Sequence, residues 1–509
     1  MQRLNDSRAI SFVIATHVVL TVALAFQLTI DVDETFTLST TSQGPMHAAD
    51  RAISFELQPP LYFGTLSLWR TVNGSLFHAR LFSVLCSALS LVVLARFLRT
   101  FLPDITPWHV VALAAFSPVM IYAAVEARCY AMVILLSCLQ ISFFAAAFMV
   151  PESTLRTRAA FIVVAVASLY SFYFLGFMLA AGGVILVVAR RWRMAGLYIL
   201  SMVCVAACFT PLALIVSGQV ESHTTTVGST PGLLEALRSV TWRLRNMVLP
   251  VDWAPLDGIA KAAWLILAVG VVFTLSRKWR ALVASPATSV FVGYAIVVGC
   301  FIAVTRALGT ELVVERHFSL LLIPTVIVVS YGVCLSGGRR AMQGFALIAA
   351  LCMLASLPVR YPHFAKSGDW RRVAEVVMQH EQEHQPVVVF TPAAARAVEY
   401  YYRGRNPLVP LPQSQASDRY APHEFQLNSP DDVRECVSKA SPDHNTLWLI
   451  LDAEQFAGRG FGAEHLKAYL DQQYNIDMHL TLHGSTLLKC SRKSDRVFDP
   501  AGKLTAGLQ

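Results

Sequence analysis

The sequence predicts a polytopic α-helical membrane protein with a small α/β domain at its C-terminal end. Of its 509 residues, 55% are hydrophobic and only 15% are charged, whereas a soluble protein carries about 25% charged residues. The apolar residues are concentrated in runs of about 20, the length that crosses a bilayer core. Charged and polar residues become dense after residue 360. We therefore expect a membrane domain at residues 1–360 and a separate domain at residues 361–509.

The apolar runs predict about eleven spanning helices. In order, they cover residues 9–30, 79–98, 107–125, 130–150, 159–172, 173–189, 194–216, 259–276, 286–305, 318–335 and 341–357. The first run is too long for the apolar core of a signal peptide and ends in an acidic loop. We therefore do not expect it to be a cleaved signal peptide. A further apolar stretch, residues 58–72, is short and opens with Pro59-Pro60, which suits a helix start. We expect this stretch to lie on the membrane surface.

Basic residues at alternate ends of the spans predict the orientation of the chain. Lys and Arg are enriched in cytoplasmic loops, and here they gather at residues 96–99, 156–158, 190–193, 277–280 and 339–340. We expect these loops and the N-terminus to be cytoplasmic. The opposite, outer face then holds residues 31–77, 126–129, 219–258 and 306–317, together with the C-terminal domain.

The C-terminal domain alternates helical and strand patterns. Residues 370–380 read as an amphipathic helix, and residues 386–391, 446–451 and 480–488 read as strands. Strands that alternate with helices favour an α/β fold. Cys436 and Cys490 are the two cysteines of this domain. An oxidising outer face would permit a disulfide between them, but the spacing does not decide whether it forms.

The formal net charge of +8 does not indicate a nucleic-acid partner. Much of the Lys and Arg excess lies in short loops between apolar runs, where it sets orientation. A nucleic-acid site would need a basic patch with interleaved aromatic residues on a soluble face, and the sequence has none. It also has no Walker A loop, dinucleotide-binding fingerprint or CxxC pair.

Candidate functional residues gather on the predicted outer face. Asp33 and Glu34 follow the first span, and two adjacent carboxylates beside hydrocarbon are costly unless they have a function. This pair is therefore the first candidate for a catalytic base. The other polar residues that the predicted topology places on this face are Gln58, Tyr62, Arg80, Tyr122, Glu126, Arg128, Tyr130, Arg316 and His317.

A glycosyl transfer on this face can use only certain sugar donors. Nucleotide sugars are absent outside the cytoplasm, so a glycosyl transfer there must use a donor anchored in the membrane, such as a polyprenyl-phosphate sugar. Such an enzyme needs a base for the acceptor hydroxyl, which a carboxylate supplies. It also needs cations for the lipid phosphate that leaves, and arginine offers a planar fork that matches phosphate oxygens.

The ordered set of motifs resembles the GT-C superfamily of integral-membrane glycosyltransferases. It is most similar to the bacterial relatives of protein O-mannosyltransferases and to the lipid A aminoarabinose transferase. The segments that carry the resemblance are Asp33-Glu34, Gln58-Pro59-Pro60-Leu61-Tyr62, Arg80, Pro118 with Tyr122, Glu126-Ala127-Arg128-Cys129-Tyr130, and Arg316-His317 with Pro324. Position 58 departs from it, since relatives often have a cation or histidine where this chain has Gln58.

The resemblance implies a GT-C fold with surface helices on the outer side and a location in the bacterial inner membrane, with a periplasmic C-terminal domain. It also implies transfer of a sugar from a polyprenyl-phosphate donor to an extracytoplasmic acceptor in the cell envelope, with inversion. Asp33 would be the base, and Glu34 would orient Asp33 or the acceptor. Arg128, helped by Arg316, would stabilise the leaving phosphate. The acidic pair could instead hold a divalent metal ion.

Plainer interpretations stay open for several of these residues. Asp33 and Glu34 could cap the following helix. Glu126 and Arg128 could form a structural ion pair, and Arg80 could position the end of its span. A transporter or flippase of lipid-linked saccharides, or a polymerase or ligase acting on them, is the alternative function. The sugar and the acceptor (lipid, glycan or protein) are left open.

Overall fold

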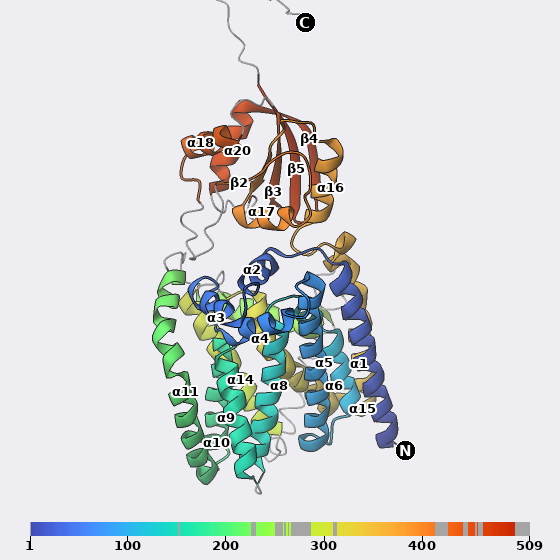
Figure 1. Cartoon of the computed structure of the whole chain (residues 1–509). Helices are drawn as coiled ribbons and strands as arrows, with labels where there is room; N and C mark the ends of the chain where they lie inside the picture. Colours follow the sequence, from blue (N-terminus) through green and yellow to red (C-terminus); the bar gives the residue numbers. More distant parts are fainter. Residues whose placement is uncertain are drawn as a thin grey trace, which may run out of the picture. The chain divides into compact units, whose positions relative to one another are not determined.

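The computed structural model describes residues 2–150, 153–224, 231–249, 287–308, 313–412, 426–440, 446–453 and 462–493, with a few isolated positions between them (Figure 1). The chain divides into two compact units. The first comprises Met1–Leu28 and Asp33–Phe364, and the second comprises Thr29–Val32 and Ala365–Gln509. The short segment Thr29–Val32 therefore belongs to the second unit although both of its neighbours in the chain belong to the first.

The first unit is a bundle of apolar helices, and the protein is a multi-pass membrane protein. Within the described residues, six helices are long and apolar enough to cross a bilayer, or seven if a bent pair forms one span. Five of them follow expected spans: α1 (Gln2–Gln27), α5 (Leu76–Phe101), α8 (Tyr130–Phe144), α11 (Trp192–Thr224) and α14 (Ala287–Leu308). The sixth runs through η3 (Glu315–Leu321) into α15 (Leu322–Arg360).

Three of the expected spans differ from separate straight helices. Residues 107–125 form α6 (Pro107–Phe116) and α7 (Pro118–Ala124), bent by 62°, because Pro118 cannot continue the hydrogen-bond ladder of α6. The straight helix expected there is therefore a bent pair of helices. The two spans expected at 318–335 and 341–357 are parts of α15, which leaves helical geometry at Gly338, where φ is 72°.

The remaining expected spans are shorter or lie elsewhere. Residues 159–189 form α9 (Leu155–Leu169), the 3-10 turn η2 (Tyr173–Leu175) and α10 (Gly176–Val188), and α8 continues into the π-helix η1 (Ala145–Met149). The span expected at 259–276 lies outside the described residues. α12 (Leu233–Val248) was not expected from the apolar runs, because its sequence LLEALRSVTWRLRNMV mixes charged and apolar residues on two faces.

Three short helices follow α1 and lie at one end of the bundle: α2 (Val32–Thr40), α3 (Pro45–Ser54) and α4 (Leu61–Arg70) (Figure 1). The ten residues of α4 correspond to a length of about 15 Å, which is too short to cross a bilayer core of about 30 Å. α4 packs on α3 and α5 and buries Tyr62, Phe63 and Leu66. The stretch at 58–72 thus contains a short helix, as expected. α2 and α3 are two further short helices that the sequence did not predict.

Buried polar contacts fix the helices of the bundle to one another. α5 packs on α8 and α1, while α6 packs on α1 and α15. His17 of α1 joins three of these helices, because its Nδ1 lies 2.8 Å from the Ala115 carbonyl oxygen and its Nε2 lies 2.9 Å from the Ser87 hydroxyl. Hydrogen bonds of this kind contribute to helix association in a membrane, where packing alone provides no hydrophobic driving force.

The second unit is a five-stranded sheet in the order β2-β1-β3-β5-β4. β1 (Val387–Phe390) pairs in parallel with β2 (Leu408–Leu411) and β3 (Thr446–Asp452), and β5 (Ser485–Arg492) pairs antiparallel with β3 and β4 (Tyr474–Leu482). The strands expected at 386–391 and 446–451 are confirmed. The single strand expected at 480–488 is wrong, since these residues span the turn between β4 and β5.

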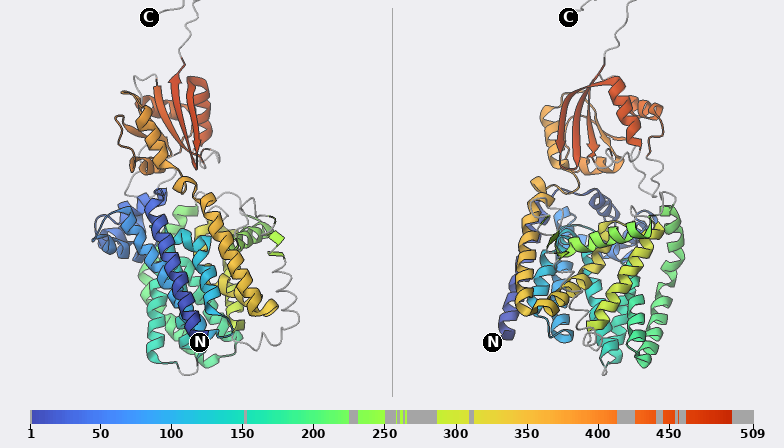
Figure 2. Two further views of the ribbon diagram at one scale, coloured as in Figure 1. Left: turned by 90° about the vertical axis from the view of Figure 1, so that its right-hand side faces the viewer. Right: turned by 180° about the vertical axis from the view of Figure 1, so that it is seen from behind.

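Helices cover both faces of this sheet (Figure 2). α18 (Pro430–Ala440) and α20 (Ala463–Gln473) enclose a core that includes Val388, Leu449 and Leu488. α16 (Trp370–His380) has the bounds expected from the sequence, and α17 (Pro392–Glu399) follows β1. Cys490 belongs to the core under α18, and Cys436 packs against it. Both are free thiols in the structure, which has no disulfide between them.

Candidate active site

Glu34 is fixed by a buried pair of charges. Arg80 donates from Nε to Glu34 Oε1 at 2.8 Å and from Nη2 to Oε2 at 2.6 Å. The backbone N–H of Ala127 also donates to Oε1, at 2.9 Å. The Glu34 and Arg80 side chains are 0% and 1% exposed. This planar, two-point pairing joins α2, α5 and the turn after α7, so Glu34 is held as part of the interior.

Arg80 also closes the end of α1. Its Nη1 donates to the carbonyl oxygens of Ala25 and Leu28, each at 2.9 Å. The last carbonyls of a helix have no partner within the helix, and a cation near them is stabilising. The guanidinium is therefore fully engaged inside the protein. This geometry agrees with a positioning role for Arg80 rather than a contact with a ligand.

Arg128 lies beside a carboxylate that the sequence motifs did not single out. Its Nη1 donates to Glu56 Oε2 at 2.8 Å and to the Thr37 hydroxyl at 3.0 Å. The same atom lies 3.5 Å from the backbone oxygen of Asp33. The Thr40 hydroxyl donates to the other carboxylate oxygen of Glu56 at 3.0 Å. Burial lowers the pKa of Arg128, but Glu56 and Asp33 raise it by more, so its pKa lies well above the ordinary value.

Asp33 faces a second cation. Its Oδ2 lies 2.8 Å from Arg316 Nη1, and the two side chains are 25% and 39% exposed. This pair is thus more accessible than the other two. Burial raises the pKa of the Asp33 carboxyl, but Arg128 and Arg316 lower it by more, and the net pKa lies below its ordinary value. Asp33 is therefore a carboxylate at neutral pH, placed to accept a proton.

Aromatic rings surround this charged group. Tyr122 and Tyr130 lie with ring centroids 6.2 Å apart, and both are close enough to Arg316 to interact with its charge. His317 packs against Phe172 and Phe174 at 6.0 Å and 5.5 Å. His317 also interacts electrostatically with Asp33. The rings give the charged centre apolar walls of the kind that bind the faces of sugars or isoprenoid units.

The remaining candidates are interior groups next to the centre. Tyr62 is 1% exposed and packs on Phe63 and Phe82. Gln58 Oε1 accepts a weak hydrogen bond from the Cys129 thiol at 3.9 Å. Glu126 is 1% exposed, and its backbone oxygen accepts from the Ser83 hydroxyl. The ion pair that the structure shows for Arg128 is with Glu56.

The structure thus separates the sequence candidates into two groups. Those gathered around the accessible charged centre are Asp33, Tyr122, Arg128, Tyr130, Arg316 and His317. The second group lies next to it: Glu34 and Arg80 form a buried support, Tyr62 and Glu126 are buried, and Gln58 is partly buried. Glu56 and Thr37 were missed, although one signal was present: Glu56 stands between Phe55 and Leu57, and a carboxylate with apolar neighbours on both sides needs a partner if it is buried.

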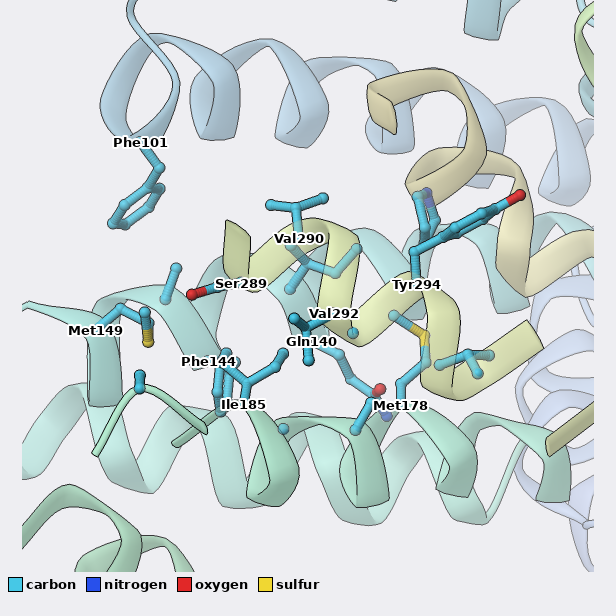
Figure 3. Close-up of a pocket in the computed structure, with 18 of the residues that line it drawn as sticks. Phe101, Gln140, Phe144, Met149, Met178, Ile185, Ser289, Val290, Val292 and Tyr294 are labelled. Carbon is cyan, nitrogen blue, oxygen red and sulfur yellow. The ribbon is translucent and has the colours of Figure 1, made fainter. Parts of the chain in front are cut away.

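The bundle also contains a partly open cavity of about 600 Å³ (Figure 3). Its lining is mostly apolar and includes Phe101 of α5, Phe144 of α8 and Ile185 of α10. Gln140 and Tyr294 bring polar groups to it (Figure 3). Gln140 is 2% exposed, and neither end of its amide has a hydrogen-bond partner within the described part of the chain. Cavities of this size hold small molecules or lipid chains.

A metal ion does not fit the side chains as they are arranged. Both carboxylate oxygens of Glu34 accept hydrogen bonds from Arg80, so Glu34 and Asp33 do not converge on one point. Among the residues described, no group of three or more His, Cys, Asp or Glu side chains is arranged to hold a metal. Guanidinium groups occupy the positions at which a cation would meet these carboxylates.

Comparison with known proteins shows only the fold of this chain. No family model and no curated protein matches the chain. Among solved structures, ArnT from Cupriavidus metallidurans bound to undecaprenyl phosphate aligns over 94% of this chain and 97% of that chain, with TM-score 0.52 and 13% identity. The apo state of ArnT gives TM-score 0.46 at 13% identity, with the same coverage of both chains.

The archaeal oligosaccharyltransferase AglB from Archaeoglobus fulgidus, in complex with an inhibitory peptide and a dolichol-phosphate, gives TM-score 0.42 at 11% identity. It is covered over 75% of its length and covers 96% of this chain. The alignment with lipid-bound ArnT is the one that shows the fold. This chain shares the fold of ArnT, in agreement with the fold expected from the sequence motifs.

Proposed function

We propose that this GT-C-fold protein is a glycosyltransferase that moves a sugar from a polyprenyl-phosphate donor to the hydroxyl of an extracytoplasmic acceptor, with inversion at the anomeric carbon. One observation carries the proposal. Asp33, an accessible carboxylate at one end of a membrane helix bundle, lies 2.8 Å from Arg316 and within 3.5 Å, through its backbone oxygen, of Arg128. A proton acceptor therefore lies beside two arginines that are suited to bind a phosphate.

The reaction needs little else from the protein. The acceptor hydroxyl gives its proton to the Asp33 carboxylate while its oxygen forms a bond to the anomeric carbon. The bond from that carbon to the phosphate oxygen breaks, and the lipid phosphate leaves with the electron pair. Single displacement of this kind inverts the anomeric centre. Arg316 and Arg128 stabilise the charge that develops on the phosphate.

The same cations link donor binding to the strength of the base. Arg128 and Arg316 hold the pKa of Asp33 below its ordinary value, which makes it a weak proton acceptor. A phosphate that binds these arginines shares their charge and relieves this effect on Asp33. The carboxylate then becomes more basic when a donor is present, which favours transfer only in the complete complex.

The cavity is suited to the lipid part of the donor. The helices that line it carry the charged centre near their other ends: Arg80 lies near the start of α5, and Tyr130 starts α8. Along α5, the lining residues Phe97 and Phe101 lie about 25 Å and about 32 Å from Arg80. Pro324, eight residues after Arg316, also lines the cavity. A solved structure of the same fold holds undecaprenyl phosphate, which supports a lipid of this class.

The experiment is a transfer assay with a polyprenyl-phosphate sugar and the protein in detergent or nanodiscs. Asp33→Asn keeps the side-chain shape and removes the proton acceptor, so transfer should fall by at least about 100-fold. Asp50→Asn changes an exposed carboxylate of α3 and should leave transfer unchanged. Near-normal transfer by Asp33→Asn, with the protein still inserted and folded, would rule out this base.

A further inference from the structure

Arg128 and Glu56 form a buried ion pair beside the proposed base. Arg128 lies in the turn between α7 and α8, and Glu56 lies between α3 and α4. Arg128 Nη1 donates to Glu56 Oε2 at 2.8 Å, and the two side chains are 6% and 5% exposed. The backbone N–H of Glu56 donates to the Arg51 carbonyl oxygen at 3.0 Å, in the last turn of α3. The pair lies entirely within the first unit.

α2, the helix that carries Asp33, supports both members of this pair. The Thr40 hydroxyl donates to Glu56 Oε1 at 3.0 Å. The Thr37 hydroxyl accepts from Arg128 Nη1 at 3.0 Å and donates to the Asp33 backbone oxygen at 3.2 Å. Thr37 and Thr40 are both 0% exposed and lie three positions apart, on one face of α2. Both carboxylate oxygens of Glu56 are thus engaged, and its position is defined.

Arg128 has a second carboxylate within the range of its charge. Glu56 and Asp33 are the two carboxylates that raise the pKa of Arg128, and its Nη1 lies 3.5 Å from the Asp33 backbone oxygen. The Asp33 carboxylate pairs instead with Arg316, at 2.8 Å. A buried guanidinium without a partner is costly. Arg128 should therefore turn to the Asp33 carboxylate if Glu56 carried no charge.

We propose that Glu56 is a positioning residue that holds the Arg128 guanidinium away from the Asp33 carboxylate. This inference rests on the proposed function, in which Asp33 is the base and Arg128 binds the donor phosphate. Paired with two arginines, Asp33 would be a weaker base, and Arg128 would already be engaged when the phosphate arrives. With Glu56 in place, the buried Nε of Arg128 has no hydrogen-bond partner among the described residues. Arginine has five N–H donors, so this one is left for a phosphate oxygen.

Glu56→Gln should change the pH dependence of transfer. The groups that act on the charge of Asp33 are Arg128, Arg316, Glu34, His317 and Tyr130. The substitution keeps the length of the side chain and removes its charge, so Arg128 pairs with Asp33 and lowers its pKa further. Asp33 then stays ionised to a lower pH, and the acid limb of kcat/KM should move to lower pH. On the plateau, kcat/KM should fall about tenfold, because the base is weaker and a phosphate contact is lost.

A double-mutant cycle with Arg128 separates positioning from a simple loss of charge. Arg128→Gln removes a cation that lowers the pKa of Asp33, so its acid limb should move to higher pH. In that background Glu56→Gln should leave the limb in place and change kcat/KM by less than about twofold, because no guanidinium is left to hold. An effect of the Glu56 charge on Asp33 alone would persist there. Asp50→Asn, an exposed carboxylate of α3, is the control and should leave the profile unchanged.

Thr40 supplies a test that leaves every charge in place. Thr40→Val removes the hydroxyl that supports Glu56 at nearly constant shape, and it should move the acid limb in the same direction as Glu56→Gln, by less. Thr40→Ser keeps the hydroxyl and should behave as wild type. Removing one member of a buried ion pair is destabilising, and thermal unfolding shows whether Glu56→Gln is folded. If it is not, a Thr40→Val profile identical to wild type overturns the proposal.

The outcomes separate this inference from the proposed function. Wild-type protein that transfers no sugar sinks the proposed function, and the role of Glu56 falls with it. In an active enzyme, an unchanged acid limb in folded Glu56→Gln overturns the positioning role alone. The same downward shift of the limb in the Arg128→Gln background also overturns it, and both results leave the proposed function standing.

Discussion

Three arginines in the first unit are engaged to different degrees, and this decides their roles. Arg80 has no accessible surface to offer, since its contacts are a buried carboxylate and helix carbonyls. Arg128 is 6% exposed in its pair with Glu56. Arg316 is 39% exposed in its pair with Asp33. A ligand that approaches the charged centre therefore meets Arg316 first, and Arg316 is the cation that can exchange Asp33 for a phosphate most easily.

Arg316→Gln should change the pH dependence of the free enzyme. Arg316 is one of the charges that lower the pKa of Asp33, so removing it raises that pKa. A higher pKa means that Asp33 is protonated, and inactive as a base, up to a higher pH. The acid limb of kcat/KM against pH should therefore move upward, and kcat/KM should fall at every pH because a phosphate contact is lost. An acid limb at the wild-type position would show that Asp33 does not set it.

Glu34→Gln should destabilise the protein. Removing one partner of a buried ion pair leaves the other charge uncompensated, at a cost of about 3–5 kcal/mol, and Arg80 is the charge left behind. Thermal unfolding in detergent measures the effect as a lower midpoint. Asp431→Asn breaks an ion pair with Arg434 in which both side chains are mostly exposed, and it should change stability by less than about 1 kcal/mol. A stable but inactive Glu34→Gln would instead give Glu34 a direct part in the chemistry.

The sequence could predict the accessible residues of the site better than their supports. Asp33, Arg128 and Arg316 stand out because charge is conspicuous beside apolar runs. The partners of Glu34 and Arg128 could not be read in the same way. They depend on how α2, α3 and α5 come together, and residues 46 and 72 positions apart in the chain carry no local sign of pairing.

Among the helices and strands, the features that the sequence prediction missed are breaks within predicted elements. The strand pattern at residues 480–488 alternates through a turn, so periodicity alone joined β4 to β5. Gly484, at φ 62°, was the local sign of that turn, since glycine adopts positive φ without strain. The break at Ser117-Pro118 was likewise marked by the proline, while the apolar residues on both sides suggested one continuous span.

Gly338 divides α15 and should not tolerate a side chain. Its φ of 72° with ψ of −169° belongs to a region used almost only by glycine. Gly338→Ala should therefore lower the stability of the protein by about 1–3 kcal/mol, read as a lower unfolding midpoint. Gly344→Ala is the control, because a Cβ added there meets nothing within 4 Å and alanine favours a helix. Equal midpoints for the two variants would contradict the assigned break.

For the whole molecule, composition alone was enough for the class of protein. A chain with 15% charged residues cannot cover its apolar runs in water, and a membrane accounts for them. The number of spans was harder to predict, because α9 and α10 are short and α15 continues through its break. The basic loops predict which side of the membrane each end of a span faces.

Cysteine labelling in intact membranes tests those sides directly. Basic loops are retained in the cytoplasm during insertion, so the loops at residues 190–193 and 339–340 should be inside. Gly44, before α3, and Ser414, in the C-terminal unit and outside the described residues, should then both be outside.

Gly44→Cys and Ser414→Cys, each in a background without the ten native cysteines, should react with an impermeant maleimide added to whole cells with a permeabilised outer membrane. Arg193→Cys, next to the start of α11, should react only after the inner membrane is opened. Labelling of Gly44→Cys and Ser414→Cys from opposite sides would mean that the number of spans between them is odd, which would contradict the predicted orientation.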